Sequence, residues 1–269
     1  MRVQGAPAFR LLLETPGDGQ RNMAVDEALL AAVGAGRSPP TLRLYGFSPP
    51  TLSLGRFQKA RELIRLDALA ADGIRLVRRP TGGQAVLHDR ELTYAVVLGR
   101  GHLEPFSKRE VYQFIAGLLL SGLEALGIRA RSGRSRLGSA HNPDCFRATG
   151  EYEIADDGQR KLIGSAQVLS RTASLQHGAI PLDGSYRRVS GYLKRACEEE
   201  HGLPASLGEE LGREVSFAEA ELAFQQGARF ALERLGLRLE AGELSAEELR
   251  RTEELRLEKY ARDEWNLLY

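Results

Sequence analysis

The segment that most constrains the fold is residues 78–89, where an apolar stretch enters a turn that contains a proline and paired glycines. Residues 74–77 before it are apolar enough to predict a strand. The turn Pro80-Thr81-Gly82-Gly83 leads to a second apolar stretch that ends in His88-Asp89. Paired glycines let a backbone pass within contact distance of a ligand, and the flanking arginines suit a carboxylate, a phosphate or a similar group. The segment therefore predicts a strand–turn–strand unit beside a bound group.

Composition narrows the class of protein. The chain has 269 residues, of which 42% are hydrophobic and 27% charged, as in ordinary soluble globular proteins. Its net charge of +1 gives no basic field to favour nucleic acid. No apolar run approaches the ~20 residues of a membrane span, and the N-terminus has no signal-peptide core. We expect a cytoplasmic protein that binds neither membrane nor nucleic acid.

The order of elements predicts an α/β (α+β) fold with a mixed β-sheet core flanked by helices. Strands are expected at 9–14, 41–45, 51–54, 92–98 and 173–182, with a hairpin of 151–154 and 161–169. Helices are expected at 20–33, ending at Gly34, and from Ser107 to about residue 126, ending at Gly127. Two more helices begin at Ser216 and Ser245. We expect one main domain over 1–210 and a C-terminal helical appendage over 211–269 packed on it.

The chain has two cysteines, Cys145 and Cys197, which is too few for a disulfide scaffold, and no cluster has metal-ligand spacing. Cys145 follows a polar segment, 131–144, that predicts a mobile loop. A free cysteine is most often a small buried hydrophobe, and spacing alone slightly favours that role. The polar surroundings of Cys145, with His141 and Arg147 nearby, instead suit an exposed thiol with a lowered pKa.

Three further residues have a structural and a functional interpretation. Lys161 is either a solvated lysine beside a hairpin turn or a compact positive charge near a carbonyl oxygen. It is followed by the small residues Gly164, Ser165 and Ala166, which leave room beside the backbone. His88 beside Asp89 is more often a structural pair, and for His177 packing and function are evenly balanced.

Three motifs resemble, in the expected order, the lipoate and octanoate attachment family, which includes lipoate–protein ligases and octanoyltransferases. They are the Gly-Gly turn with its arginines, the dipeptide Cys145-Phe146, and the run Arg160-Lys161-Leu162-Ile163-Gly164-Ser165-Ala166-Gln167. The segment 175–180 resembles the strand that lines the acyl pocket, and 259–266 resembles the family's C-terminal ending. The resemblance spans about residues 22–182.

The resemblance implies a biotin/lipoate protein ligase catalytic-domain fold and a role for each motif. Cys145 would be the nucleophile and Lys161 its catalytic partner, while His88 would position the acyl group rather than transfer a proton. The implied substrate-binding residues are Arg79, Thr81, Gly82, Gly83, His88, Gly164, Ser165, Ala166, His177 and Gly178. Whether the chain after Cys145 folds back to bring Lys161 opposite it is left open by the sequence.

At two places the sequence departs from the pattern of the ligases and resembles the octanoyltransferases. Ligases usually have a third glycine where this chain has Gln84, and a Gly-Asn element where it has Glu91-Leu92-Thr93-Tyr94. An octanoyltransferase needs neither ATP nor another cofactor, because its donor, octanoyl-acyl carrier protein, is already a thioester. The implied acceptor is a lysine of a lipoyl domain or of the glycine-cleavage H protein, and the implied oligomeric state is a monomer.

Three alternatives remain. An ATP-dependent lipoate–protein ligase would use Lys161 at an acyl-adenylate and leave Cys145 without a role. An octanoyl amidotransferase would move the acyl group between two carrier proteins. A non-catalytic relative that binds an acyl group or a carrier protein would keep its function after Cys145→Ala.

Overall fold

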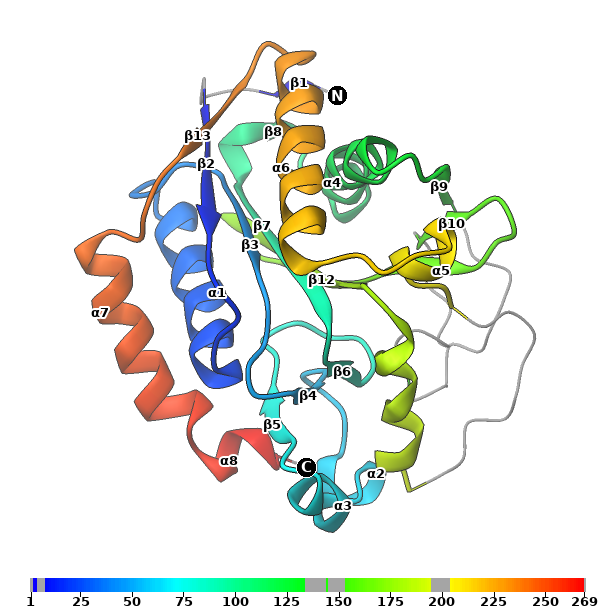
Figure 1. Cartoon of the computed structure of the whole chain (residues 1–269). Coiled ribbons are helices and arrows are strands. Elements are labelled where there is room, and N and C mark those ends of the chain that lie inside the picture. The colour runs from blue at the N-terminus through cyan, green and yellow to red at the C-terminus, as the bar shows by residue number, and fades with distance from the viewer. Residues whose placement is uncertain (1, 4–7, 134–143, 145–152, 195–203, 269) are drawn as a thin grey trace.

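The computed structural model describes residues 2–3, 8–133, 144, 153–194 and 204–268 (Figure 1). Its centre is a sheet of eight strands in the order β13-β2-β3-β7-β12-β11-β10-β9. The strands are β2 (Ala8–Leu13), β3 (Thr41–Tyr45), β7 (Glu91–Gly99), β9 (Ala130–Gly133), β10 (Glu153–Asp156), β11 (Lys161–Leu169), β12 (Ala173–Pro181) and β13 (Arg238–Ala241). Strands β13, β2 and β3 are parallel, and every later pair is antiparallel, so the sheet is mixed as expected.

Helices cover both faces of this sheet (Figure 1). On one face lie α1 (Gly19–Gly34) and α7 (Ala246–Leu255), and on the other lie α4 (Lys108–Ala125) and α6 (Phe217–Glu233). All nine residues of β7 and all five of β3 are buried. A strand covered on both faces can be apolar along most of its length, which explains why residues 92–98 are mainly apolar and do not alternate with polar ones.

A second, smaller sheet has the order β5-β4-β6. It consists of β4 (Thr51–Leu54), β5 (Arg75–Arg78) and β6 (Val86–His88), and it lies below the large sheet in Figure 1. The Gly-Gly turn connects β5 to β6, so this sheet carries the segment from which the sequence argument began. A separate cluster that includes Leu52, Leu87 and Val189 forms its apolar core.

Short elements complete the fold. They are β1 (Arg2–Val3), β8 (Leu103–Glu104), α2 (Ala60–Leu63), α3 (Leu66–Ala71), η1 (Arg100–His102), η2 (Gly184–Tyr192), α5 (Leu207–Leu211), η3 (Arg256–Tyr260) and α8 (Asp263–Asn266). Within the described ranges no helix is both long enough and apolar enough to cross a membrane.

Most expected elements are present, with two corrections. Helix α1 includes Gly34, and the left-handed residue after it is Gly36, with φ 70°. The polar segment predicted as a loop begins as strand β9, because Arg131 to Gly133 pair with β10 through backbone hydrogen bonds that do not require apolar side chains. Residues 134–143 of that segment lie outside the described residues.

The C-terminal part is connected to the large sheet. Helix α6 packs on α4, and β13 pairs with β2 at the sheet edge, from Arg238 opposite Ala8 to Ala241 opposite Leu11. The division of the chain at residue 210 stays a prediction.

Candidate functional site

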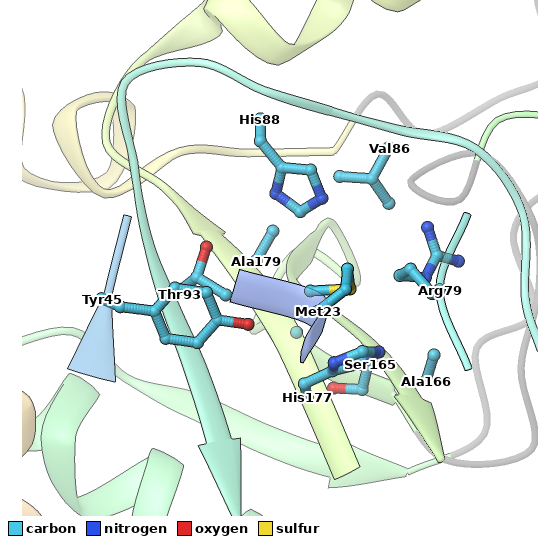
Figure 2. Close-up of a pocket in the computed structure, with 12 residues that line it drawn as sticks. Met23, Tyr45, Arg79, Val86, His88, Thr93, Ser165, Ala166, His177 and Ala179 are labelled. Carbon is cyan, nitrogen blue, oxygen red and sulfur yellow. The ribbon is translucent and has the colours of Figure 1, made fainter. Parts of the chain in front are cut away.

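A pocket lies where the large sheet, α1 and the small sheet meet (Figure 2). Its lining residues are Met23, Tyr45, Arg79, Val86, His88, Thr93, Gly164, Ser165, Ala166, His177, Gly178 and Ala179. Of the predicted substrate-binding residues, Arg79, His88, Gly164, Ser165, Ala166, His177 and Gly178 are therefore brought together here. The other three, Thr81, Gly82 and Gly83, form the adjacent turn.

The floor of the pocket is one face of the large sheet. Residues in register on adjacent strands point to the same face, and Tyr45, Thr93, Ala179 and Gly164 form one such row across β3, β7, β12 and β11. The next row on that face contains Ala95, His177 and Ala166, again from adjacent strands. Small residues leave space in these rows: Gly164 and Ala166 on β11, and Ala179 on β12.

His88 is part of a buried hydrogen-bond chain. The Arg79 Nη1 donates to Ser53 Oγ at 2.6 Å, and Ser53 Oγ lies 2.7 Å from His88 Nε2. His88 Nδ1 then donates to Glu91 Oε1 at 2.5 Å, and Thr93 Oγ1 donates to the same oxygen. Both ring nitrogens of His88 therefore have hydrogen-bond partners in the walls.

His177 is held in the same way from the opposite wall. The Thr81 hydroxyl lies 2.7 Å from His177 Nε2, and His177 Nδ1 lies 2.8 Å from Asp26 Oδ2. Asp26 also accepts from Arg43 Nη1 at 2.8 Å and from the hydroxyl of Tyr45 at 2.9 Å. Three donors, from His177, Arg43 and Tyr45, thus converge on a carboxylate that is completely buried.

The pKa values follow from this arrangement. Burial alone would raise the pKa of Asp26, but the hydrogen bond from His177 and the charge of Arg43 outweigh it and hold the pKa below its ordinary value. Burial lowers the pKa of His177, against the opposing effect of Asp26. His177 is therefore neutral at pH 7, and its ring orientation is set by Thr81 and Asp26.

The hydrogen bonds of His88 and His177 limit what the pocket can bind. Its polar side chains have their hydrogen-bonding atoms engaged by partners in the walls, and the remaining surface comes from Met23, Val86, Ala166, Ala179 and glycine backbone. Burying a polar group without a partner is costly, so a pocket with its polar groups already satisfied accepts an apolar ligand without that cost. The geometry suits an aliphatic chain.

The Gly-Gly turn lies against β4 and β11. The Arg79 Nη2 donates to the carbonyl oxygens of Gly82 at 3.1 Å and Gln84 at 2.8 Å, which fixes the turn from inside. Gly83 has φ 89°, a conformation that favours glycine. A Cβ on Gly55 would lie 1.8 Å from the carbonyl oxygen of Gly83, and one on Gly83 would lie 3.5 Å from the Cβ of Ala166.

Cys145 lies outside the described residues, but its neighbour Asp144 is described. Asp144 forms a parallel bridge with Ala85 and is buried. Ala85 follows the Gly-Gly turn and precedes Val86, which lines the pocket. The chain therefore passes beside the turn immediately before it reaches Cys145.

Lys161 is buried at the start of β11. Its Nζ lies 2.9 Å from Glu153 Oε2 and 3.1 Å from Glu153 Oε1, across the β10–β11 hairpin. An irregularity in register between Ile154 and Ala155 accompanies this contact. Lys161 begins the strand that supplies Gly164, Ser165 and Ala166 to the pocket. Its position relative to Cys145 lies outside what the described residues define, and the catalytic roles of both stay predictions.

Sequence reasoning missed Met23, Asp26, Tyr45, Glu91 and Thr93. Asp26 had a readable signal, because it occupies the apolar stripe of α1 between Met23 and Leu29, where an acidic residue needs a partner. The others depend on strand register that the sequence does not reveal. Among the residues that the structure describes, no group of three or more His, Cys, Asp or Glu side chains could hold a metal ion.

The chain is similar to known proteins over most of its length. Residues 18–229 match the lipoyl protein ligase A/B catalytic domain. The octanoyltransferase LipM of Kyrpidia tusciae is 44% identical over 275 residues, covering 96% of this chain and 98% of the relative. The structure of T. acidophilum protein Ta0514 with bound lipoic acid is 28% identical, with a TM-score of 0.80 over 97% of this chain and 99% of that one.

A second solved structure, lipoate-protein ligase A bound with ATP, is 26% identical, with a TM-score of 0.80 and coverage of 97% of this chain and 98% of that one. The matched domain covers well over half of the chain and contains the turn, the pocket and Lys161. This chain belongs to the lipoyl protein ligase A/B catalytic domain family.

Proposed function

We propose that this chain is an octanoyltransferase that moves an octanoyl group from acyl carrier protein to a lysine of a lipoyl domain or of the glycine-cleavage H protein. The transfer proceeds through a thioester on Cys145. The reaction class is supported by relatives that are named octanoyltransferases and that align with this chain over nearly the full length of both proteins. The acyltransferase acts in the cytoplasm, where a reducing environment keeps a nucleophilic thiol free.

The observation that carries this proposal is that the polar groups of the pocket already have hydrogen-bond partners in its walls. His88 and His177 direct both ring nitrogens to partners in the walls, and the Tyr45 hydroxyl is engaged by Asp26. What faces the inside is hydrocarbon and backbone. Such a site binds a saturated acyl chain better than a polar or charged ligand.

The bridge between Ala85 and Asp144 supports Cys145 as the nucleophile. A thioester carbonyl at the open end of an acyl pocket must meet an attacking atom beside that end. The chain one residue before Cys145 is next to the Gly-Gly turn, and a Cβ built on Gly83 of that turn would lie 3.5 Å from the Cβ of Ala166 on β11.

The chemistry balances without a cofactor. The Cys145 thiolate attacks the carbonyl carbon of the donor thioester, a C–S bond to Cys145 forms, and the bond to the carrier's sulfur breaks. The carrier leaves as a thiolate and takes up the proton that Cys145 lost. The acceptor lysine, as a neutral amine, then attacks the same carbon and forms an amide, and Cys145 is released as the thiolate while the amine loses its proton.

Lys161 is proposed to stabilise negative charge in both steps. Lys161 is buried, and its Nζ lies 2.9 Å from a carboxylate oxygen of Glu153. An ammonium group near Cys145 would lower the pKa of the thiol and stabilise the oxyanion. Backbone N–H groups at Gly82, at Gly83 or of Cys145 itself would assist at the oxyanion.

The ATP-dependent ligase is kept as the second candidate because a solved lipoate-protein ligase A bound with ATP has the same fold over nearly the whole chain. The Gly-Gly turn argues against it. Gln84 stands where ligases usually have a third glycine, and its Oε1 accepts from Gln58 Nε2 at 2.8 Å. Gln58 in turn accepts from the backbone N–H of Gly55 at 3.0 Å. A pair of side-chain amides thus braces the turn.

The test is acyl transfer to a lipoyl domain with three donors in parallel, namely octanoyl-acyl carrier protein, free octanoate and octanoylated H protein. We expect octanoylated lipoyl domain from octanoyl-acyl carrier protein without ATP, and none from free octanoate with ATP and Mg²⁺. The opposite pattern would establish the ligase. Product from octanoylated H protein, with none from the acyl carrier protein, would establish the amidotransferase.

A further inference from the structure

The walls of the pocket decide how long an acyl chain can enter it. Twelve residues from α1, the two sheets and the turn after β5 line it. If the proposed function holds, the acyl chain lies against these walls, so the length that fits depends on which wall side chains can move aside.

Most side chains of the described walls are fixed by hydrogen bonds. His88 is held at both ring nitrogens by Ser53 and Glu91, and His177 by Thr81 and Asp26. Moving either ring would break two buried hydrogen bonds, which is costly.

Three other side chains of the lining are also held by hydrogen bonds. Arg79 is bound to Ser53 and to the turn carbonyls, and the Tyr45 and Thr93 hydroxyls are bound to buried carboxylates. Val86 is β-branched, so its χ1 is stiff, and it is fixed on strand β6. The remaining contributions are glycine, alanine and serine residues of the sheet floor.

Met23 differs from all of these. It extends from α1, is 1% exposed, and belongs to an apolar cluster that contains Ala24 and Ala28 of the same helix. Its side chain is unbranched with three rotatable bonds and a thioether that is a weak acceptor, so it changes rotamer without losing a strong hydrogen bond. Figure 2 shows it across the middle of the pocket, between the rings of His88 and His177.

We propose that Met23 is the movable wall of the acyl pocket and sets the longest acyl chain that the enzyme accepts. The incoming chain turns the Met23 side chain aside, and the space available after that movement fixes the position of the last methylene. Met23 is thus a specificity-determining residue for the proposed transfer, which this inference presupposes.

The experiment is a competition in one mixture. Hexanoyl-, octanoyl- and decanoyl-acyl carrier protein are supplied together, and the adducts on the chain are measured by intact-mass spectrometry. The ratio of adducts does not depend on how much of a variant is folded. For Met23→Ala we expect the decanoyl-to-octanoyl ratio to rise about tenfold, because two further methylenes are buried in the space that the side chain vacates.

Two further variants show whether the effect depends on the flexibility and position of the Met23 side chain or only on the size of the truncation. Met23→Ile has nearly the same volume but a stiff, branched side chain, so we expect slower octanoylation and no gain for the decanoyl donor. Leu29→Ala is an equally large truncation at a fully buried position of α1 that does not line the pocket. We expect its adduct ratio to equal that of the wild type.

The outcomes distinguish this inference from the function on which it rests. An octanoyl adduct on the wild type, with the same ratio in Met23→Ala, overturns the role of Met23 and leaves the transferase standing. A ratio that changes equally in Leu29→Ala also overturns it, because the effect would then be general loosening. Absence of any adduct on the wild type overturns both proposals.

Discussion

At the scale of single residues, the site combines buried charge with an apolar interior. Asp26, Glu91 and Glu153 are buried carboxylates, each held by a histidine or a lysine. Buried ion pairs add little net stability but are costly to break, because the remaining partner stays charged and desolvated. Their contribution here is orientation: they fix two histidine rings in the pocket and one lysine at the start of β11.

The lowered pKa of His177 predicts an acid-sensitive fold. Below about pH 6.5 the unfolded chain binds a proton at this residue that the folded chain does not. The free energy of unfolding should therefore fall as the pH drops from 7 to 5, and His177→Gln should flatten that dependence. Urea unfolding at several pH values measures it.

The control for this prediction is His102, whose pKa burial also lowers. His102→Gln gives the contribution of that histidine, which is separate from the pocket. If His177→Gln has the same pH dependence as the wild type, the neutral His177 described above is incorrect.

The Lys161–Glu153 pair gives a second prediction at this scale. Lys161→Met should lower the rate of acyl-enzyme formation by about 10²–10³-fold, the usual effect of removing one group that stabilises an oxyanion. Rapid mixing followed by mass spectrometry measures this rate. Lys108→Met removes an exposed lysine at the start of α4 and should leave the rate unchanged. Equal rates in all three proteins would remove Lys161 from the mechanism.

Individual site residues were predictable where a motif carried them. Arg79, His88, Gly164 and His177 were predicted from motifs that resemble the family, whereas the residues alone favoured a structural role for His88 and left His177 evenly balanced. Met23 and Tyr45 were not predictable, since they reach the pocket through helix packing and through the β3–β7 register, which are long-range features.

At the scale of elements, the floor of the pocket depends on close packing of β7, β12 and β11. The hydroxyl of Tyr94 on β7 lies 2.7 Å from Ser165 Oγ on β11, with Gly178 of β12 in register with both. A Cβ on Gly178 would lie 2.1 Å from the carbonyl oxygen of Gly164 and 2.7 Å from Tyr94 Cε1. Glycine at this position lets the two hydroxyl side chains meet across the middle strand.

Gly178→Ala should therefore destabilise the protein by roughly 1–3 kcal/mol, as overpacking of a close-packed interior does. Gly117→Ala, on helix α4, is the matched control: a Cβ there meets nothing within 4 Å. It should be neutral or stabilising by up to about 1 kcal/mol, because alanine favours helix. Thermal unfolding compares the two, and equal melting temperatures would contradict the packing described.

The extents of the elements were largely predictable because their signals are local. Capping residues Ser107, Ser216 and Ser245 each accept a hydrogen bond from a backbone N–H three residues later, as their spacing predicts. The pairing of β13 with β2 was not predictable, since it joins segments more than 200 residues apart, and β9 lacked the apolar alternation that identifies a strand.

At the scale of the whole molecule, Arg78 joins the C-terminus to the small sheet. Its guanidinium, completely buried, donates to carbonyl oxygens of Gly55 and Gln58 on one side and of Asn266 and Leu268 on the other. The end of the chain thus supports the strand that leads into the Gly-Gly turn.

Arg78→Met should lower the free energy of unfolding by about 3 kcal/mol or more, because several buried carbonyl groups lose their donor. For a chain of this size the melting temperature should fall by about 6 °C or more. Arg75→Met on the same strand removes an exposed arginine and should change the melting temperature little. Similar melting temperatures for the two variants would mean that the C-terminal contacts do not stabilise the small sheet.

The most direct test of the account is intact-mass spectrometry of the purified chain mixed with octanoyl-acyl carrier protein, without ATP or Mg²⁺. We predict one octanoyl adduct that is absent in Cys145→Ser, present in the control Cys197→Ser, and lost when a lipoyl domain is added and becomes octanoylated. No adduct under these conditions, together with octanoylation of the lipoyl domain from free octanoate and ATP, would contradict the acyl-enzyme and assign the chain to the ligases.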